Sequence, residues 1–471
     1  MRIAVCEKAN KQCRKLLTRQ TAYASFVNYG TSKPTTGDGI MSEKDLSKGW
    51  SVTFSGMGIN LALGILYAWS VIKGGIPDSW GWTNADKALP YSIACMAFAL
   101  AMVPAGRLQD KIGPRWVATL GGVFVGVGFI IAALTGSSLA GFIIGFGILG
   151  GIGIGFGYAS ATPPAVKWFP PQKTGMIAGL VVAGFGLASV YIAPLATKLL
   201  TVFGTTMTKT DPVTGIVKQV VEKGVSTTML VFGIAFLIIV VILSQFLRDP
   251  PKGYVPPGSP AKGSAAAKAA VDRGWKEMLS TGQFYILWLI YFAGASAGLT
   301  FISVAQDLGK RSLGELAFVA VAILAVGNAS GRIIAGLISD KIGRQWTLFG
   351  FLILQAIVLF VLYLLKGGAS WPIVLLIVLL IGANYGSNLS LFPSATKDFF
   401  GLKNFGVNYG FVFTAWGVGG LIMPWVNGRV KDATGSDTLT FFIIIAVLII
   451  AALLTFVSRS IAARDAAAAK A

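Results

Sequence analysis

The chain has 471 residues, of which 54% are hydrophobic and only 12% are charged, and its mean hydropathy is +0.71. A soluble domain usually carries about 25% charged residues, so this composition excludes a soluble fold. The net charge of +20 does not indicate a nucleic-acid partner, because the Lys and Arg residues lie in short loops between apolar stretches, as the positive-inside rule describes.

The first 45 residues differ from the rest of the chain. Residues 1–40 are basic and acid-poor, and they lack the continuous apolar core of a signal peptide. Met41 offers a second start for translation ahead of the first apolar stretch. We therefore expect residues 1–45 to be a disordered cytoplasmic extension, or one that the native protein lacks, with a targeting segment as the alternative.

Twelve apolar stretches follow, each long enough to cross a membrane. A hydrocarbon core of about 30 Å is crossed by about 20 apolar residues in a helix. The sequence predicts an all-α membrane protein whose twelve transmembrane helices form two pseudo-symmetric six-helix halves, residues 46–247 and 281–460, ahead of a cytoplasmic tail at 461–471. The predicted spans are 50–73, 87–106, 115–135, 139–165, 174–198, 227–247, 281–306, 314–337, 346–366, 371–396, 405–428 and 438–458.

A polar linker at 248–280 joins the two halves. Its prolines and glycines break helices, and its six Lys and Arg residues place it in the cytoplasm. An even number of spans then places both termini in the cytoplasm, in a multi-pass protein of the plasma membrane. The loop at 201–227 argues weakly against this orientation, because it carries three lysines on the predicted outer side.

Two short runs occur twice at one offset. Residues 106–115 follow the second span and residues 336–344 follow the eighth, 230 residues later. Lys167-Trp-Phe169 and Lys397-Asp-Phe399 are separated by the same 230 residues. Two pairs at one offset indicate that the halves arose by duplication.

The duplicated run resembles the cytoplasmic signature of the major facilitator superfamily, and the resemblance covers roughly residues 45–460. It implies that each aspartate of the run pairs with an arginine or a helix N-terminus and latches two helices together on the cytoplasmic side. Tight basic turns without a gating role are the alternative. The gating residues that it implies are Gly106, Asp110 and Arg115 in the first half and Gly336, Asp340 and Arg344 in the second.

Several shorter stretches carry a narrower resemblance. They include 64–70, Tyr158 with 167–170, 328–332, 391–394 with 399–401, and 408–410. Together they resemble the oxalate:formate antiporter family, which is close to the monocarboxylate transporters. This resemblance implies a carboxylate held between the halves by one arginine in the eighth span, flanked by aromatic side chains.

Arg332 is the one charged residue well inside a predicted span. A charge at the centre of a membrane helix costs about 2.5–3.5 kcal/mol on insertion scales, so its presence indicates function. Its planar guanidinium can hold a carboxylate through two parallel hydrogen bonds. Asn328 lies one turn earlier on the same helix face and can orient Arg332 or donate to the substrate. The alternative is that Arg332 extends toward the cytoplasm, near Asp340.

The first half has no charge that matches this arginine, so further polar groups must come from other spans. Tyr67 in span one and Tyr158 in span four match family positions. Tyr385 and Asn388 lie in span ten, with Asn384 on the same face as Asn388. A tyrosine offers an apolar wall and one hydroxyl, which suits a small organic anion, although helix packing is an alternative role for each.

Two departures from the family bear on the substrate. The oxalate carriers place a second cation, a lysine, in span eleven, where this chain has Trp416. A single cation favours a monocarboxylate, because a dianion would keep a poorly compensated charge. Animal monocarboxylate transporters carry an aspartate and a lysine where this chain has Asn328 and, approximately, Tyr67, so no side chain here is an obvious proton carrier.

Glycines at a four-residue spacing are predicted to let helices pack closely and the halves rock about the centre, with simple packing as the alternative. They lie at Gly147, Gly151 and Gly155, at Gly175 and Gly179, at Gly382 and Gly386, and at Gly406 and Gly410.

These residues predict a secondary active transporter that moves a small monocarboxylate of the lactate, pyruvate, formate or acetate class by alternating access. We expect a monomer in the lipid bilayer whose substrate moves with protons or against a counter-anion. The alternatives are an oxalate/formate or other dicarboxylate exchanger, a sugar or drug carrier on the same fold, and a carboxylate sensor that does not transport. We expect no enzyme, cofactor or metal site, because the chain has no histidine and its three cysteines lack metal-ligand spacing.

Overall fold

The computed structural model describes residues 43–468, except 171–172, 211–216, 252–253, 255, 257–271, 366–369 and 402–403. Most of the predicted extension and much of the predicted linker therefore lie outside the described residues. From Glu43 onward the chain forms one compact unit. Within the described part of this unit, twelve helices are long and apolar enough to cross a membrane, and they coincide with the twelve predicted spans.

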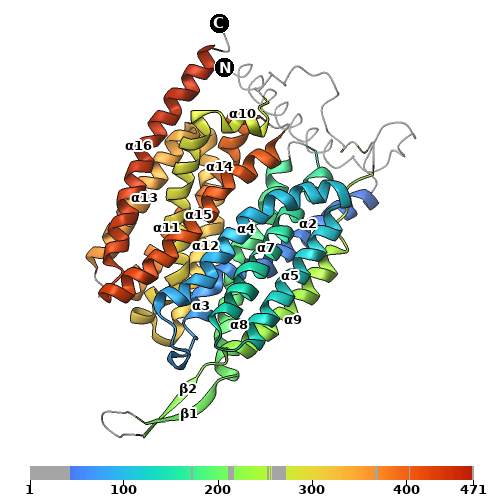
Figure 1. Ribbon diagram of the computed structural model, residues 1–471. Coiled ribbons are helices and arrows are strands. Elements are labelled where there is room, and N and C mark those ends of the chain that lie inside the picture. The colour runs from blue at the N-terminus through green and yellow to red at the C-terminus, as the bar shows by residue number, and fades with distance from the viewer. Residues whose placement is uncertain are drawn as a thin grey trace, which may run out of the picture. The chain divides into compact units, whose positions relative to one another are not determined.

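The first half supplies the blue-to-green helices of Figure 1. Its first span consists of three consecutive elements, and its fourth span also combines several. In chain order the elements are α2 (Glu43–Leu63), η1 (Gly64–Ala68), α3 (Trp69–Lys73), η2 (Asp78–Trp80), α4 (Asn84–Ile112), α5 (Pro114–Leu134), α6 (Leu139–Phe142), η3 (Ile143–Gly150), α7 (Gly151–Lys167), α8 (Thr174–Val202), β1 (Thr205–Thr210), β2 (Val217–Glu222) and α9 (Val225–Ser244).

The second half supplies the yellow-to-red helices and begins with a short helix ahead of its six spans. The elements are α10 (Trp275–Leu279), α11 (Gly282–Leu313), η5 (Gly314–Ala317), α12 (Phe318–Ile342), α13 (Arg344–Leu364), α14 (Trp371–Phe400), α15 (Phe405–Thr434) and α16 (Thr438–Ala468). Two helix pairs join the halves, because α4 packs along α15 and α8 packs along α12. The helix α11 also contacts η1 and α3 of the first half.

The predicted repeat appears in the backbone. Gly113 separates α4 from α5 with φ 85° and ψ 161°, and Gly343 separates α12 from α13 with φ 91° and ψ 158°. Such positive φ angles are open to glycine but strained for other residues. The duplicated runs therefore make the same turn at corresponding places in the two halves.

The glycine faces serve close packing at some of the predicted positions. A Cβ atom at Gly151 would lie 2.6 Å from the Ala94 carbonyl oxygen, and one at Gly155 would lie 2.7 Å from that of Phe98, so α7 and α4 are in backbone contact. The prediction is wrong at Gly179 and Gly406, where an added Cβ would meet no atom within 4 Å. A four-residue spacing does not reveal which neighbour, if any, a glycine face meets.

Three local features were not predicted. The first span is interrupted by the 3-10 segment η1, and the fourth contains the π-helical segment η3. The loop predicted at 201–227 contains an antiparallel hairpin in which Thr205 lies opposite Glu222. Its strands are rich in Thr and Val, which favour extended backbone. We call the end of the bundle with this hairpin the hairpin face, and the opposite end, with Gly113 and Gly343, the linker face.

Candidate functional site

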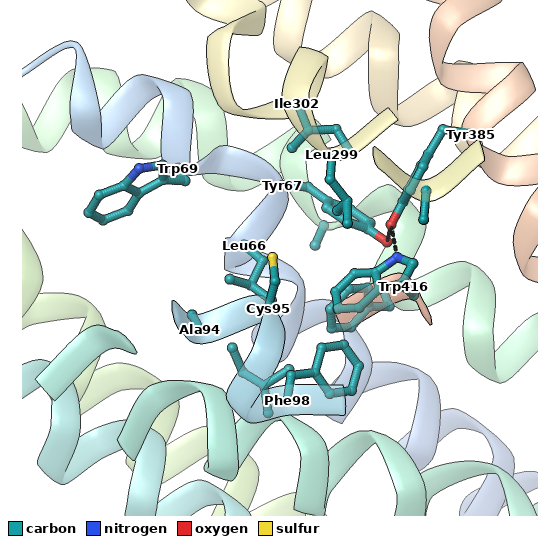
Figure 2. Close-up of a cluster of buried hydrophobic side chains, with 14 of the residues drawn as sticks. Leu66, Tyr67, Trp69, Ala94, Cys95, Phe98, Leu299, Ile302, Tyr385 and Trp416 are labelled. Atoms are coloured by element: carbon teal, nitrogen blue, oxygen red, sulfur yellow. Dashed lines mark hydrogen bonds between the residues drawn. The ribbon is translucent and has the colours of Figure 1, made fainter. Parts of the chain in front are cut away.

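Three aromatic side chains from separate spans form a hydrogen-bonded chain, which Figure 2 shows. The hydroxyl of Tyr67 lies 2.8 Å from that of Tyr385, and the indole Nε1 of Trp416 donates to the Tyr385 hydroxyl over 2.8 Å. Tyr67 belongs to the first half, whereas Tyr385 on α14 and Trp416 on α15 belong to the second. All three are buried. The chain therefore joins the halves in the interior of the bundle.

The break in the first span positions Tyr67. A side chain at Gly64 would overlap Ala188 and the Phe185 carbonyl of α8, so glycine lets η1 lie directly against that helix. The ring of Tyr67 then meets the ring of Phe185 edge-on, with centroids 5.0 Å apart. Discontinuous helices of this kind are common where a membrane carrier binds its substrate.

Arg332 lies at the seam between α12 and α8. Its Nε donates to Asn328 Oδ1 over 3.1 Å, and its Nη1 donates to the carbonyl oxygen of Val182 in the first half over 3.0 Å. Its Nη2 is buried and has no hydrogen-bond partner among the described residues. The guanidinium also lies near the hydroxyls of Tyr67 and Tyr158, and the Tyr158 hydroxyl comes close to hydrogen-bond geometry with it. It thus turns toward the first half and keeps one donor uncommitted.

Aromatic rings surround these polar groups. Phe98 meets Trp416 with centroids 5.1 Å apart and Tyr158 with centroids 5.4 Å apart. Phe185 in turn meets Tyr158 at 5.2 Å and Tyr67 at 5.0 Å. The rings run from one half to the other, so the polar groups of the site lie among aromatic side chains. We call the following set the central site: Tyr67, Phe98, Tyr158, Phe185, Asn328, Arg332, Tyr385 and Trp416.

Glycines fix the position of Arg332 on the bundle. A side chain at Gly386 of α14 would overlap the Asn328 carbonyl, and one at Gly331 of α12 would overlap the Ala383 carbonyl. The backbones of α12 and α14 are therefore in direct contact, as small residues allow. The Gly382 and Gly386 pair was predicted, whereas its partner face at Gly327 and Gly331 was missed although it shows the same four-residue spacing.

Asn388 does not join Arg332. It lies against Gly294 of α11 and lines a small pocket inside the second half, together with Asn384 and Gln355 of α13. Its amide nitrogen donates to the Asn384 carbonyl over 3.3 Å. Tyr385 borders both places, with its hydroxyl in the central site and its ring against this pocket.

The second-half gating run forms an ion-pair cluster on the linker face. Arg344 donates through Nη1 to Asp340 over 2.8 Å and through Nε to Asp398 over 3.1 Å. Asp398 belongs to the other repeated motif, so the cluster ties the start of α13 to the end of α14. This geometry fits a latch, and Asp340 is accordingly paired with Arg344 and not with Arg332. An added Cβ at Gly336 would meet no atom within 4 Å.

The first-half run is arranged differently. Arg115 is exposed, and its guanidinium lies 5.3 Å from the ring centroid of Trp116. The side chain of Asp110 lies outside the described residues, so the predicted latch of this half stays a prediction. Gly106 faces open space, as Gly336 does.

Among the described residues, twelve apolar helices form two similar halves that meet at a buried polar centre, which is the architecture of an integral multi-pass membrane protein. The chain belongs to the Major Facilitator Superfamily, whose family model matches residues 49–424 and 320–470.

Individual relatives agree with this assignment. The chain is 27% identical over 401 residues to the oxalate:formate antiporter of Oxalobacter formigenes, covering 84% of this chain and 87% of that one. It is 25% identical over 399 residues to apicoplast pyruvate carrier 1 of Toxoplasma gondii, covering 76% and 72%. A crystal structure of a bacterial homologue of the human lysosomal transporter Spinster has the same fold, with a TM-score of 0.64 at 17% identity over 90% of this chain and 98% of that one.

Proposed function

We propose that the protein is a secondary carrier of small monocarboxylates whose carboxylate is bound by Arg332. The observation that carries the proposal is the uncommitted, buried Nη2 of Arg332 beside the hydroxyls of Tyr67 and Tyr158. A buried donor without a partner is costly, and a carboxylate oxygen would satisfy it. The likeness to a pyruvate carrier and an oxalate:formate antiporter supports the same substrate class.

The composition of the central site favours one negative charge on the substrate. Arg332 is the charged member of this site, and its other members are aromatic or amide side chains. Trp416 directs its indole N–H to Tyr385 and brings no cation to the central site. A dianion at one arginine would keep an uncompensated charge in a low-dielectric setting. Exchange of oxalate for formate is the second candidate, favoured by the likeness to the Oxalobacter protein.

The contacts of the site connect binding to movement of the halves. Arg332 donates to the Val182 carbonyl across the seam. A carboxylate that accepts hydrogen bonds from both terminal nitrogens of Arg332 replaces this contact. The hydroxyl pair of Tyr67 and Tyr385 joins the halves beside it. Substrate binding thereby exchanges contacts between the halves for contacts to the ligand, as alternating access requires. We place the linker face and both termini in the cytoplasm and the protein in the plasma membrane, as a monomer, with Arg344 as part of a cytoplasmic latch.

Uptake into proteoliposomes tests the proposal. We expect saturable acetate or pyruvate uptake by the wild type, a loss of about tenfold or more in Arg332→Lys, which keeps the charge but not the planar fork, and background uptake in Arg332→Ala. Arg459→Lys is the matched control, because Arg459 lies over the Trp346 ring, outside the central site. Full transport by Arg332→Ala would refute the assignment.

A competition panel of formate, acetate, lactate, pyruvate, oxalate and malonate resolves the substrate class. Stronger competition by oxalate than by every monocarboxylate would favour the second candidate. Running the panel with and without a pH gradient separates proton symport from anion exchange.

A further inference from the structure

A pocket with a volume of about 420 Å³ lies on the hairpin face, away from the central site. Residues of both halves line it, from the end of the first span and the start of α4 on one side and from α11 and α15 on the other. Its volume falls within the range of small-molecule sites. The cationic side chains that line it are Lys73, Lys87, Lys223, Lys310 and Lys431.

Positive charge exceeds negative charge among the lining residues. The five lysines face three carboxylates, those of Asp78, Glu222 and Asp307. Lys87 lies 3.4 Å from Asp78, whose side chain is 93% exposed, and Lys310 lies 3.3 Å from Asp307. Lys431 in turn lies 3.9 Å from Asp437, which stands outside the lining. These pairs neutralise most of the cluster and leave a small excess of positive charge, which attracts small anions.

Lys73 is the most buried of these lysines, with 6% of its surface exposed. It ends α3, and its Nζ lies 4.0 Å from Asp307 Oδ2, while the other oxygen of that carboxylate is closer to Lys310. A buried ammonium is costly unless it is well paired. Lys73 has a long contact to a shared carboxylate, so a small anion in the pocket would compensate its charge.

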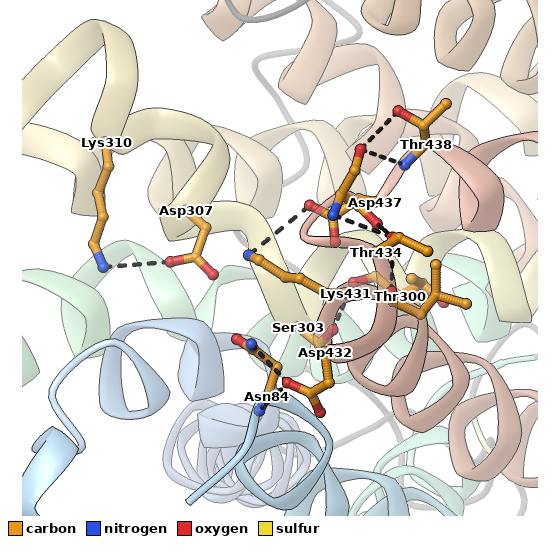
Figure 3. A network of polar contacts seen from close by, with 12 residues as sticks. Asn84, Thr300, Ser303, Asp307, Lys310, Lys431, Asp432, Thr434, Asp437 and Thr438 are labelled. Atoms are coloured by element: carbon orange, nitrogen blue, oxygen red, sulfur yellow. Dashed lines mark hydrogen bonds and ion pairs between the residues drawn. The ribbon is translucent and has the colours of Figure 1, made fainter.

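The contact of Lys73 with Asp307 also joins the two halves on this face. A second such contact lies nearby, where Asp432 of α15 caps the start of α4, as Figure 3 shows. Its carboxylate accepts hydrogen bonds of 2.9 Å from the backbone and side-chain amides of Asn84 and from the backbone of Ala85. An anion bound by Lys73 competes with Asp307 and leaves the Asp432 cap in place.

We propose that this pocket is a second anion-binding site, for a small carboxylate, and that its occupant competes with Asp307 for Lys73. The lysines act as point charges without the planar match of a guanidinium, so binding is weaker than a bidentate arginine site would give. The pocket shares no residue with the central site. The inference therefore does not depend on the role of Arg332.

The test uses the full-length protein in detergent with Arg332→Gln, which removes the central cation. The probe is trifluoroacetate, followed by broadening of its ¹⁹F resonance at constant ionic strength. We expect binding to persist in Arg332→Gln, to weaken by about fivefold when Lys73→Gln is added, and to strengthen by about threefold when Asp307→Asn is added. Lys198→Gln, an exposed lysine of α8 outside the pocket lining, is the matched control and leaves binding unchanged.

Several outcomes would refute the proposed second anion-binding site. One is loss of all broadening in Arg332→Gln, which places every bound anion at the centre. Another is an equal response to Lys73→Gln and Lys198→Gln. Displacement of trifluoroacetate by chloride as readily as by acetate would show that the pocket does not select among anions and would refute the carboxylate assignment. If Lys73→Gln fails to fold, two other variants decide the test. Lys310→Gln, which changes an exposed lysine of the same pocket, should weaken trifluoroacetate binding, and Asp307→Asn should strengthen it.

Discussion

The hydrogen bond from Arg332 to Asn328 allows a quantitative test of how the central site holds its cation. In Asn328→Ala the guanidinium loses the acceptor that lies 3.1 Å from its Nε and keeps the Val182 carbonyl. A hydrogen bond to a charged group contributes about 1.5–3 kcal/mol to stability. If this energy holds Arg332 in its binding geometry, its loss lowers kcat/KM by about 10- to 150-fold.

Initial rates of acetate uptake into proteoliposomes, measured over a range of concentrations, give this ratio. Asn427→Ala is the matched control, because Asn427 is a buried asparagine of α15 outside the central site. Both variants must elute and unfold as the wild type does, so that a loss of transport reports on the site. Transport by Asn328→Ala within threefold of the wild type, or equal losses in both variants, would refute the idea that Asn328 positions the arginine.

Three further changes test other parts of the structure. Trp416→Lys adds a second cation and is expected to make oxalate a stronger competitor of acetate uptake, whereas Trp416→Phe is expected to leave this competition unchanged. The same competition by oxalate in both variants would contradict the charge argument. Gly386→Ala puts a methyl group against the Asn328 carbonyl and should destabilise by about 1–3 kcal/mol in thermal unfolding, while Gly406→Ala, where an added Cβ meets no atom within 4 Å, should not. Asp432→Asn weakens the contact between α15 and the start of α4 and should speed maleimide labelling of a cysteine placed at the buried Ser303, whereas Asp78→Asn should not. Unchanged labelling in Asp432→Asn would show that this contact does not limit access to Ser303.

The spans and the arginine could be predicted because their signals are local. An apolar stretch of about 20 residues identifies a membrane helix without knowledge of its neighbours. Arg332 stands out for the same reason, since a charge in such a stretch is rare and costly. The predicted members Tyr67, Tyr385 and Trp416 meet in the structure, although nothing in the sequence indicated that their polar atoms bond to one another.

Other features depend on how helices are turned against their neighbours. The four-residue spacing of Asn384 and Asn388 shows that they share a helix face, but the rotation of α14 decides that Asn388 meets Gly294. The partner of Arg332 in the first half is the carbonyl of Val182, and a backbone oxygen leaves no mark in the sequence. Lys73 was assigned to the end of a span, and only the folded chain brings it near Asp307.

The duplication explains both the likeness and the asymmetry of the two halves. Gly113 and Gly343 make the same turn, yet 230 residues before Asn328 the first half has Phe98, a ring that packs on Trp416. The second half therefore supplies the cation, Arg332. The first half supplies aromatic rings and the Val182 carbonyl, which accepts a hydrogen bond from Arg332. Under the proposed function a ligand must satisfy both halves, because Arg332 and many of the aromatic rings of the central site come from opposite sides of the seam. We infer that one negative charge and a small apolar group are the features on which selection by this site depends.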